Sequence, residues 1–362
     1  MLKFSWQKRL IAPSRKSFQC FHSFSGLNEP QKVAFFGSDS FSITSLRALS
    51  KLSKDQPEAV KSIDVIAKHP KRTGRDLKQV TDVPIVEAAE SEGLNVIRAE
   101  TNTEILDLIK NQYSLAIAVS YGKLIPKKLI ESVPYSLNLH PSLLPRYSGA
   151  SPLQYALLNQ DEFTGVTLQT LHPTKFDKGQ IVDQSDPIRL EEHGSLGHLE
   201  QRLAIVGADM LVKNLVSGNF KNPDFISNYE YSYAKKIVPS MKEVFWDKYS
   251  ADEIVARYNA LGDLFTFKEV KVKQKRKPLR HEYRRVILSE LEVSEDIDGA
   301  IPGDFSLEGE VIKIQTVNGA VSAKTLQLEF QKREDASTFW KGLAKRSGDT
   351  PRLFSTQPLK ES

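Results

Sequence analysis

Cysteine is almost absent from this chain of 362 residues, and long apolar runs are missing. Cys20 is the single cysteine, and it lies in a basic segment that we expect to be removed, so a disulfide framework and a cysteine-based metal site are excluded. Residues 115–119 are typical of the longest apolar runs, far short of the about 20 residues of a membrane-spanning helix. We therefore expect no membrane insertion.

The motifs of several large enzyme classes are also missing. The chain contains no GxGxxG, GxxxxGK[ST], HExxH, GxSxG or paired CxxC. Gly37-Ser38-Asp39 stands where a dinucleotide-binding domain would carry its glycine loop, but without that spacing it predicts a tight turn from strand to helix. We place His193 and His198 at the surface. No metal and no covalent nucleophile is expected.

Acidic residues are missing before Glu29. The same segment is rich in serine and carries five early positive charges: Lys3, Lys8, Arg9, Arg15 and Lys16. This composition is typical of a mitochondrial transit peptide, although a basic tail without a targeting role is the plainer alternative. We assign residues 1–28 to a transit peptide and expect the protein in the mitochondrial matrix.

Strand-like and helix-like segments alternate over residues 30–218. Short apolar runs at 32–36, 63–67, 115–119, 134–140 and 165–171 predict strands, and apolar positions at helical spacing lie between them. A long helix is expected over 194–216. This alternation favours an α/β fold with a Rossmann-like parallel sheet.

The periodicity changes after this region. Residues 219–240 contain glycine and proline with little periodicity, which indicates a linker. Ser250-x-x-Glu253 predicts a capping box for a helix over 254–261. Runs at 266–272, 286–291, 309–316 and 325–330, with a helix near 336–344, predict a small OB-like β-barrel domain over 241–346 and a tail over 347–362.

Asn138 and His140 are the residues most able to carry chemistry. They stand two apart at the end of an expected strand, so their side chains share one side of it, at the edge where open α/β sheets bind ligands. A lone histidine there is more often structural. An amide beside an imidazole, with a carboxylate within reach, suits acyl transfer. Asp177 is the candidate carboxylate, although an aspartate two residues before a glycine is by itself more often a turn residue.

These residues and their neighbours resemble a known family. The chain is similar to the formyltransferases that use 10-formyltetrahydrofolate, over about residues 33–188. The resemblance rests on five segments in order: Ser120-Tyr121-Gly122-x-x-Ile125-Pro126, Leu137-Asn138-Leu139-His140-Pro141-Ser142-Leu143-Leu144-Pro145-Arg146-Tyr147, Gly149-Ala150-x-Pro152, Gly165-Val166-Thr167 and Asp177-x-Gly179.

The resemblance implies an activity and a set of site residues. Asn138, His140 and Asp177 would form the catalytic set, and 10-formyltetrahydrofolate would be the co-substrate. The folate pocket would be lined by six residues: Tyr121, Gly122, Ser142, Leu143, Leu144 and Pro145. In that role Asn138 would donate a hydrogen bond to the formyl oxygen and Asp177 would orient His140.

The two-domain layout resembles the branch of the family that formylates initiator methionyl-tRNA. Tyr233-Ala234-x-Lys236 is similar to the linker of that branch, and Arg72 and Arg75 stand where it has a loop that meets the tRNA acceptor end. The chain departs from the pattern in two places. The loop has few prolines, and Leu261-Gly262-Asp263 replaces a proline-rich turn.

A basic run in the second domain points to the same partner independently. Glu269 and Glu282 are its only acids. It carries nine positive charges between residues 266 and 285: Lys268, Lys271, Lys273, Lys275, Arg276, Lys277, Arg280, Arg284 and Arg285. A solvated face is the usual meaning of such a run, and a path for tRNA phosphates is the alternative that we favour here, with Lys271, Lys273, Lys275, Arg276 and Lys277 as the candidates.

Two other functions stay open from the sequence. One is a formyltransferase that acts on a different amine, and the other is an RNA-binding relative without activity. The first would not require a basic second domain, and an intact Asn138, His140 and Asp177 speaks against the second. A monomer is expected.

Overall fold

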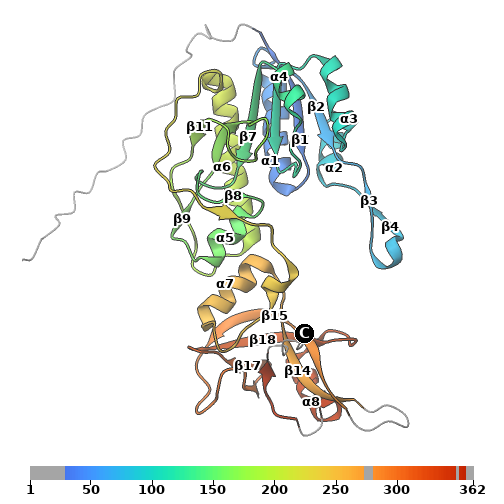
Figure 1. Cartoon of the computed structure of the whole chain (residues 1–362), viewed down its shortest axis with the longest axis vertical. Helices are drawn as coiled ribbons and strands as arrows, with labels where there is room; N and C mark the ends of the chain where they lie inside the picture. The colour runs from blue at the N-terminus through green and yellow to red at the C-terminus, as the bar shows by residue number, and fades with distance from the viewer. Residues whose placement is uncertain (1–28, 273–279, 348–349, 356–362) are drawn as a thin grey trace, which may run out of the picture.

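The computed structural model describes residues 29–272, 280–347 and 350–355, except for the side chain of Arg75. The expected transit peptide, four of the five candidate tRNA-binding residues of the basic run (Lys273, Lys275, Arg276 and Lys277) and most of the expected tail lie outside these ranges. The described residues form an α/β domain, a connecting segment and a β-rich domain (Figure 1).

The α/β domain is built on a seven-stranded sheet of order β11-β10-β7-β6-β1-β2-β5. Its strands are β1 (Gln31–Gly37), β2 (Val60–Ala67), β5 (Asn95–Arg98), β6 (Leu115–Val119), β7 (Tyr135–His140), β10 (Thr167–Thr170) and β11 (Ile181–Gln184). The predicted Rossmann-like parallel sheet is confirmed for β5, β2, β1, β6 and β7, while β10 pairs antiparallel with β7 and β11.

Helices cover both faces of this sheet, because consecutive residues of its central strands are apolar and point to opposite faces. On β1, Val33 and Phe35 belong to one apolar core and Ala34 and Phe36 to the other. The helices are α1 (Ser40–Asp55), α2 (Ile85–Ser91), α3 (Asn102–Asp107), α4 (Lys127–Ser132), α5 (Pro152–Leu158) and α6 (Leu196–Ser217), with a 3-10 turn η2 (Leu108–Asn111). The turn predicted at residues 37–39 is confirmed, with Asp39 capping α1 through Ser42 N.

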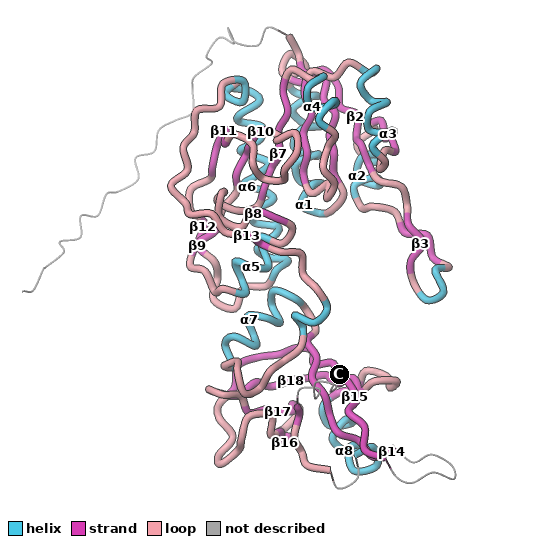
Figure 2. Tube along the Cα trace, viewed as in Figure 1, coloured by secondary structure: helices cyan, strands magenta, loops and turns pink. Residues whose placement is uncertain are grey.

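The segment around Arg72 and Arg75, expected as a loop, lies mostly in a hairpin. It is formed by β3 (Lys71–Thr73) and β4 (Gln79–Thr81), with η1 (Arg75–Leu77) between them, and it projects from the domain (Figure 2). The sequence did not predict these strands, because their side chains are mostly exposed and show no alternation of apolar and polar residues.

The connecting segment folds back onto the first domain. After η3 (Asn219–Lys221), strand β13 (Tyr233–Ala234) pairs in parallel with β8 (Ser148–Gly149), and η4 (Pro239–Lys242) leads into the second domain. Another short pair, β9 (Phe163–Thr164) with β12 (Ile188–Arg189), lies in the first domain. The expected linker is thus part of the surface beside β7.

The second domain is a curled antiparallel sheet of order β16-β17-β18-β15-β14-β20, as an OB-like fold predicts. Its elements are α7 (Ala251–Leu261), β14 (Leu264–Val272), β15 (Arg280–Ser294), β16 (Phe305–Glu308), β17 (Val311–Gln315), β18 (Ala320–Leu328), β19 (Glu334–Asp335), α8 (Ala336–Ser347) and β20 (Phe354–Ser355). The capping box at Ser250 and Glu253 is confirmed, and α7 contacts both α5 and the barrel. Among the described helices, none is long and apolar enough to cross a membrane.

Candidate active site

Asn138, His140 and Asp177 meet at the end of β7, as the sequence predicts. Asn138 Nδ2 donates to Asp177 Oδ1 at 3.4 Å, and His140 Nδ1 lies 3.4 Å from the same oxygen. Asp177 comes from the loop between β10 and β11, so the three residues converge from two parts of the chain. An amide, an imidazole and a carboxylate therefore share one position at the edge of the sheet.

Both ring nitrogens of His140 face protein acceptors. Nε2 lies 3.0 Å from the carbonyl oxygen of Tyr147, and because a carbonyl can only accept, Nε2 carries a proton. A second proton on Nδ1 would turn the contact with Asp177 into a charge-assisted hydrogen bond. The His140 and Asp177 side chains are 7% and 8% exposed, so little water screens this pair.

Asp177 is held in a backbone conformation that few residues adopt. Its φ is +51°, and its Oδ2 accepts a hydrogen bond from Gly149 N at 2.8 Å. Gly179 explains the second part of the Asp177-x-Gly179 motif. A Cβ there would lie 1.7 Å from the Thr170 carbonyl oxygen, so only glycine fits this turn.

Three groups around this site were not predicted as part of it. Gln169 lies directly across from Asn138 on β10, and its Nε2 donates to Asp177 Oδ1 at 3.3 Å. Strand alternation could have predicted Gln169, because it lies on the same side of β10 as Thr167, which pairs with His140. The other two are the backbone groups Tyr147 C=O and Gly149 N–H, which leave no side-chain signal.

The segment expected to line the folate pocket forms a tight turn after β7. Ser142 Oγ donates to Arg146 O at 2.6 Å, and Thr167 Oγ1 accepts from Leu144 N at 3.0 Å. Ser142, Leu143 and Leu144 are almost fully buried. A ligand at this turn would therefore meet Pro145, which is half-buried, rather than these three buried residues.

Tyr121 and Gly122 lie at the end of the neighbouring strand, β6. The buried Tyr121 hydroxyl donates to Ala99 O, and burial raises the pKa of this phenol. Lys68 Nζ lies 5.3 Å above the Tyr121 ring and close to Gly122, and partial burial lowers the pKa of this ammonium group. A positive charge thus stands at the same edge of the sheet as the β7 site.

The candidate tRNA-binding residues fall into two regions. Arg72 lies on β3 and the backbone of Arg75 lies in η1, both on the projecting hairpin. Lys271 is on β14 of the barrel. The basic run needs one correction. Lys268 is 1% exposed and cannot contact a phosphate, because it faces the barrel interior with its strand neighbours Thr266 and Val270.

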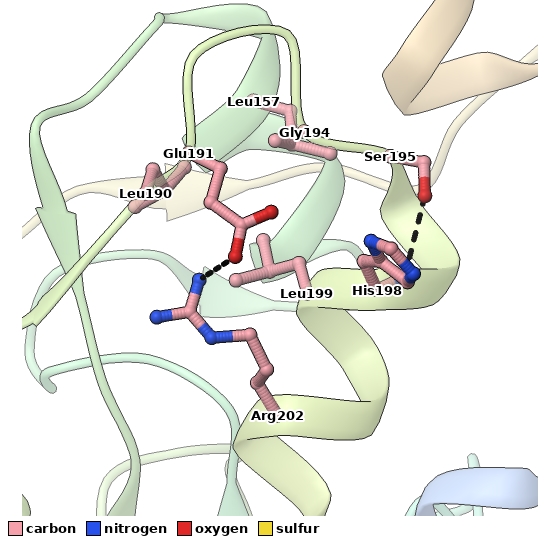
Figure 3. Close-up of a pocket in the computed structure, with 8 residues that line it drawn as sticks. All are labelled: Leu157, Leu190, Glu191, Gly194, Ser195, His198, Leu199 and Arg202. Atoms are coloured by element: carbon pink, nitrogen blue, oxygen red, sulfur yellow. Dashed lines mark hydrogen bonds and ion pairs between the residues drawn. The ribbon is translucent and has the colours of Figure 1, made fainter.

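A pocket elsewhere in the first domain contains none of the predicted site residues (Figure 3). It lies at the start of α6 between His198, Arg202 and Glu191, and its volume is about 10 Å³, near the lower limit for one water molecule. The Arg202–Glu191 ion pair at 3.0 Å closes one side. His193 and His198 are exposed, as predicted. Within the described ranges no group of His, Cys, Asp or Glu is arranged to hold a metal ion.

Comparison with known proteins gives two kinds of match. Residues 31–215 match the formyl transferase family. The mitochondrial methionyl-tRNA formyltransferase of Saccharomyces cerevisiae is 33% identical over an alignment 389 positions long, gaps included, which covers 94% of this chain and 97% of that protein. The methionyl-tRNA formyltransferase of Streptococcus pneumoniae (strain Hungary19A-6) is 26% identical and covers 87% of this chain and 96% of its own length.

A solved structure shares the fold. The N-formyltransferase from Helicobacter canadensis, in complex with folinic acid and dTDP-3-aminofucose, superposes with a TM-score of 0.55. It is 18% identical and covers 81% of this chain and 98% of that chain.

Proposed function

This chain belongs to the formyl transferase family, and from that premise we propose that it transfers the formyl group of 10-formyltetrahydrofolate to the amino group of initiator methionyl-tRNA. The reaction serves the start of translation in mitochondria. The similarity to the yeast mitochondrial enzyme extends over both domains, which supports this substrate. The observation that carries the chemistry is the convergence of Asn138 and His140 on Asp177.

Asn138 is the proposed donor to the formyl oxygen. Its side chain is half-buried at the sheet edge, whereas His140 beside it is buried. When the amine bonds to the formyl carbon, negative charge develops on that oxygen. One well-placed donor in a site with little water stabilises this charge by about 3 kcal/mol.

His140 and Asp177 are the proposed proton-handling pair. The attacking amine loses one proton, and the folate nitrogen that leaves the formyl carbon gains one. His140 can pass a proton or supply positive charge near the oxygen, and the Asp177 carboxylate favours the charged ring and fixes its orientation. The reaction as proposed uses no covalent enzyme intermediate.

The folate co-substrate is proposed to bind between the ends of β6 and β7. Tyr121 and Gly122 would form one side, and the turn of Ser142, Leu143, Leu144 and Pro145 would form the other. A largely buried turn that ends at the half-buried Pro145 suits a planar ligand that needs orientation by a few polar groups. The bound folinic acid in the Helicobacter canadensis protein supports a folate in this fold.

The two domains are proposed to divide the tRNA between them. Residues 30–218 would hold the acceptor end at the β7 site, with Arg72 and Arg75 of the hairpin beside it. Residues 241–346 would bind the phosphate backbone through Lys271 and the four basic residues that lie outside the described ranges. Residues 219–240 would connect them, and the enzyme would act as a monomer.

The mitochondrial matrix is the proposed location, and residues 1–28 the proposed targeting signal. A version lacking residues 2–26 should keep its activity in the test tube and stay in the cytosol, as fluorescence imaging can show. Import of this shortened protein would contradict the proposed signal.

Formylation of methionyl-tRNA by the purified chain tests the function directly. The protein is mixed with 10-formyltetrahydrofolate and aminoacylated initiator tRNA, and formyl-methionine is measured after the ester is hydrolysed. A dTDP-amino sugar serves as the competing amine. Formylation of the sugar alone would indicate a different substrate class, and tRNA binding without turnover would indicate an inactive relative.

A further inference from the structure

The connecting segment, residues 219–240, contacts the loop of residues 145–150 beside the candidate active site mainly through Ser232. Ser232 bonds to that loop in three places. Its Oγ accepts from Tyr147 N at 2.9 Å, its backbone N donates to Pro145 O at 3.3 Å, and its backbone O accepts from Ser148 N at 3.0 Å. Ala234 O then accepts from Ala150 N at 2.9 Å. The segment thus closes over residues 145–150.

The same loop holds both members of the proton-handling pair from its other side. The Tyr147 carbonyl accepts from His140 Nε2 at 3.0 Å, and Gly149 N donates to Asp177 Oδ2 at 2.8 Å. Residues 147 and 149 therefore stand between Ser232 and the site. Any shift of this loop moves the hydrogen-bond partners of both His140 and Asp177.

The loop adopts a conformation that needs outside support. Tyr147 has a φ of +55°, which is unfavourable for a residue with a side chain, and Gly149 has a φ of +121°. A Cβ on Gly149 would lie 2.5 Å from Ala234 O, so the connecting segment lies directly against it. At the amide of Tyr147, the side chain of Ser232 in the connecting segment supports this conformation.

We propose that Ser232 is a positioning residue for the formyl transfer, acting through Tyr147 on His140. The Ser232 Oγ atom fixes the N–H group of Tyr147. The carbonyl group of Tyr147 then fixes the His140 ring against Asp177. The inference rests on the proposed function, since it concerns the same site. It also makes the connection between the domains a part of the catalytic geometry rather than a tether.

Ser232→Ala removes the Oγ acceptor and leaves the two backbone hydrogen bonds of residue 232. We expect kcat to fall about 10-fold, because misplacing a catalytic group by around an ångström costs up to about 10²-fold. The KM values for methionyl-tRNA and folate should stay within about twofold, since no binding group is removed. Ser232→Thr keeps an Oγ and should restore kcat.

Ser227→Ala is the matched control. Ser227 lies in the same connecting segment, and its Oγ donates to the Leu144 carbonyl at 2.6 Å, but it does not bond to Tyr147 or Gly149. This variant should keep kcat. The proposal is overturned if Ser232→Ala has the kcat of the unaltered protein, if Ser232→Thr is as slow as Ser232→Ala, or if Ser227→Ala is equally slow.

A spectroscopic measurement separates this inference from the proposed function. In protein with ¹⁵N-labelled histidine, the ring N–H of His140 should give a downfield, slowly exchanging signal, assigned by its loss in His140→Asn. Ser232→Ala should shift this signal and speed its exchange, while Ser227→Ala should not. An unaltered signal in Ser232→Ala overturns the positioning role. If the unaltered protein fails to formylate methionyl-tRNA, the function fails and the signal still tests the contact.

Discussion

The two domains each bury a charged side chain, and they satisfy it differently. In the first domain, the Asp177 carboxylate faces the His140 ring and also accepts from Gly149 N. In the barrel, the Lys268 ammonium donates to two neutral oxygens, Glu269 O at 2.9 Å and Thr350 Oγ1 at 2.8 Å. Burial lowers the pKa of Lys268 to about 8.

Burial of a charge therefore does not by itself mark a functional site. The carboxylate of Asp177 has a partner that can carry the opposite charge, and it stands at the sheet edge where a ligand can approach. Lys268 lies in the middle of β14 and faces the barrel core. The first arrangement lies where a ligand can reach it, whereas the second mainly costs stability.

The largest expected effect comes from removing the charge of Asp177. Asp177→Asn keeps the shape of the side chain but no longer favours a charged His140, so kcat should fall by about 10² or more. Asn138→Ala and His140→Ala should do the same. Steady-state kinetics with methionyl-tRNA measure the change.

Binding of tRNA is the control for these variants. The dissociation constant for methionyl-tRNA should change little, because the proposed phosphate contacts lie on the hairpin and the barrel. A variant with near-normal kcat would remove its residue from the mechanism.

The sequence predicted the cluster of Asn138, His140 and Asp177 in part, for identifiable reasons. Strand alternation placed Asn138 and His140 on one side of β7, which the structure confirms. Asp177 is 37 residues after His140, so no spacing rule connects them; the residues alone make it a candidate carboxylate, and the resemblance implies its place in the catalytic set. The Tyr147 carbonyl and the Gly149 amide could not be predicted, because their positions depend on a loop with positive φ values.

In the barrel, a charged side chain on a strand lies on the buried face of the sheet. Lys268 was counted with the basic run, although a strand over 266–272 puts it on the same face as Thr266 and Val270. The hairpin strands β3 and β4 were missed because polar residues fill both of their faces. Charge counts over a strand therefore need to be divided by face before a binding surface is inferred.

Lys268→Met tests the cost of the second buried charge. The folded pKa of about 8 lies below the unfolded value of 10.5, so the unfolded chain binds more protons between these pH values. The cost is fully present below about pH 8 and disappears as the pH rises toward 10.5. Relative to Lys268→Met, the unaltered protein should gain on the order of 2 kcal/mol between pH 7.5 and about 10.

Tryptophan fluorescence follows this change in the barrel when the protein is prepared without residues 2–26, which carry Trp6. Trp246 and Trp340 belong to the second domain, and residues 30–218 contain no tryptophan. Denaturant titrations at several pH values give the free energy of unfolding of both proteins. Parallel curves of unfolding free energy against pH for the two proteins would mean that folding does not lower the pKa of Lys268. The kcat of Lys268→Met should be unaltered at pH 7.

The smallest expected effect contrasts Lys268 with the five candidate phosphate-binding residues of the basic run. Lys271, Lys273, Lys275, Arg276 and Lys277 are replaced together by serine. If they contact tRNA phosphates, each contact that is lost lowers the number of counterions released when tRNA binds. The slope of log K against log[salt] should then flatten by about 0.7 to 0.9 per contact. The KM for methionyl-tRNA should rise while the KM for folate stays the same, because the folate is proposed to bind in the other domain.

Matched variants show whether position or charge is responsible. Lys268→Met removes a positive charge from β14 but from its buried face, so it should leave the salt slope unaltered. Lys127→Ser with Lys128→Ser removes two charges from α4 and should also leave the salt slope unaltered.

The variant with five serines should bind initiator and elongator tRNAs more weakly by about the same factor, because phosphate contacts do not read sequence. An unaltered slope and affinity in that variant would make the run a solvated surface. Selection of the initiator would in either case come from the acceptor end, where Arg72 and Arg75 of the hairpin are the candidates.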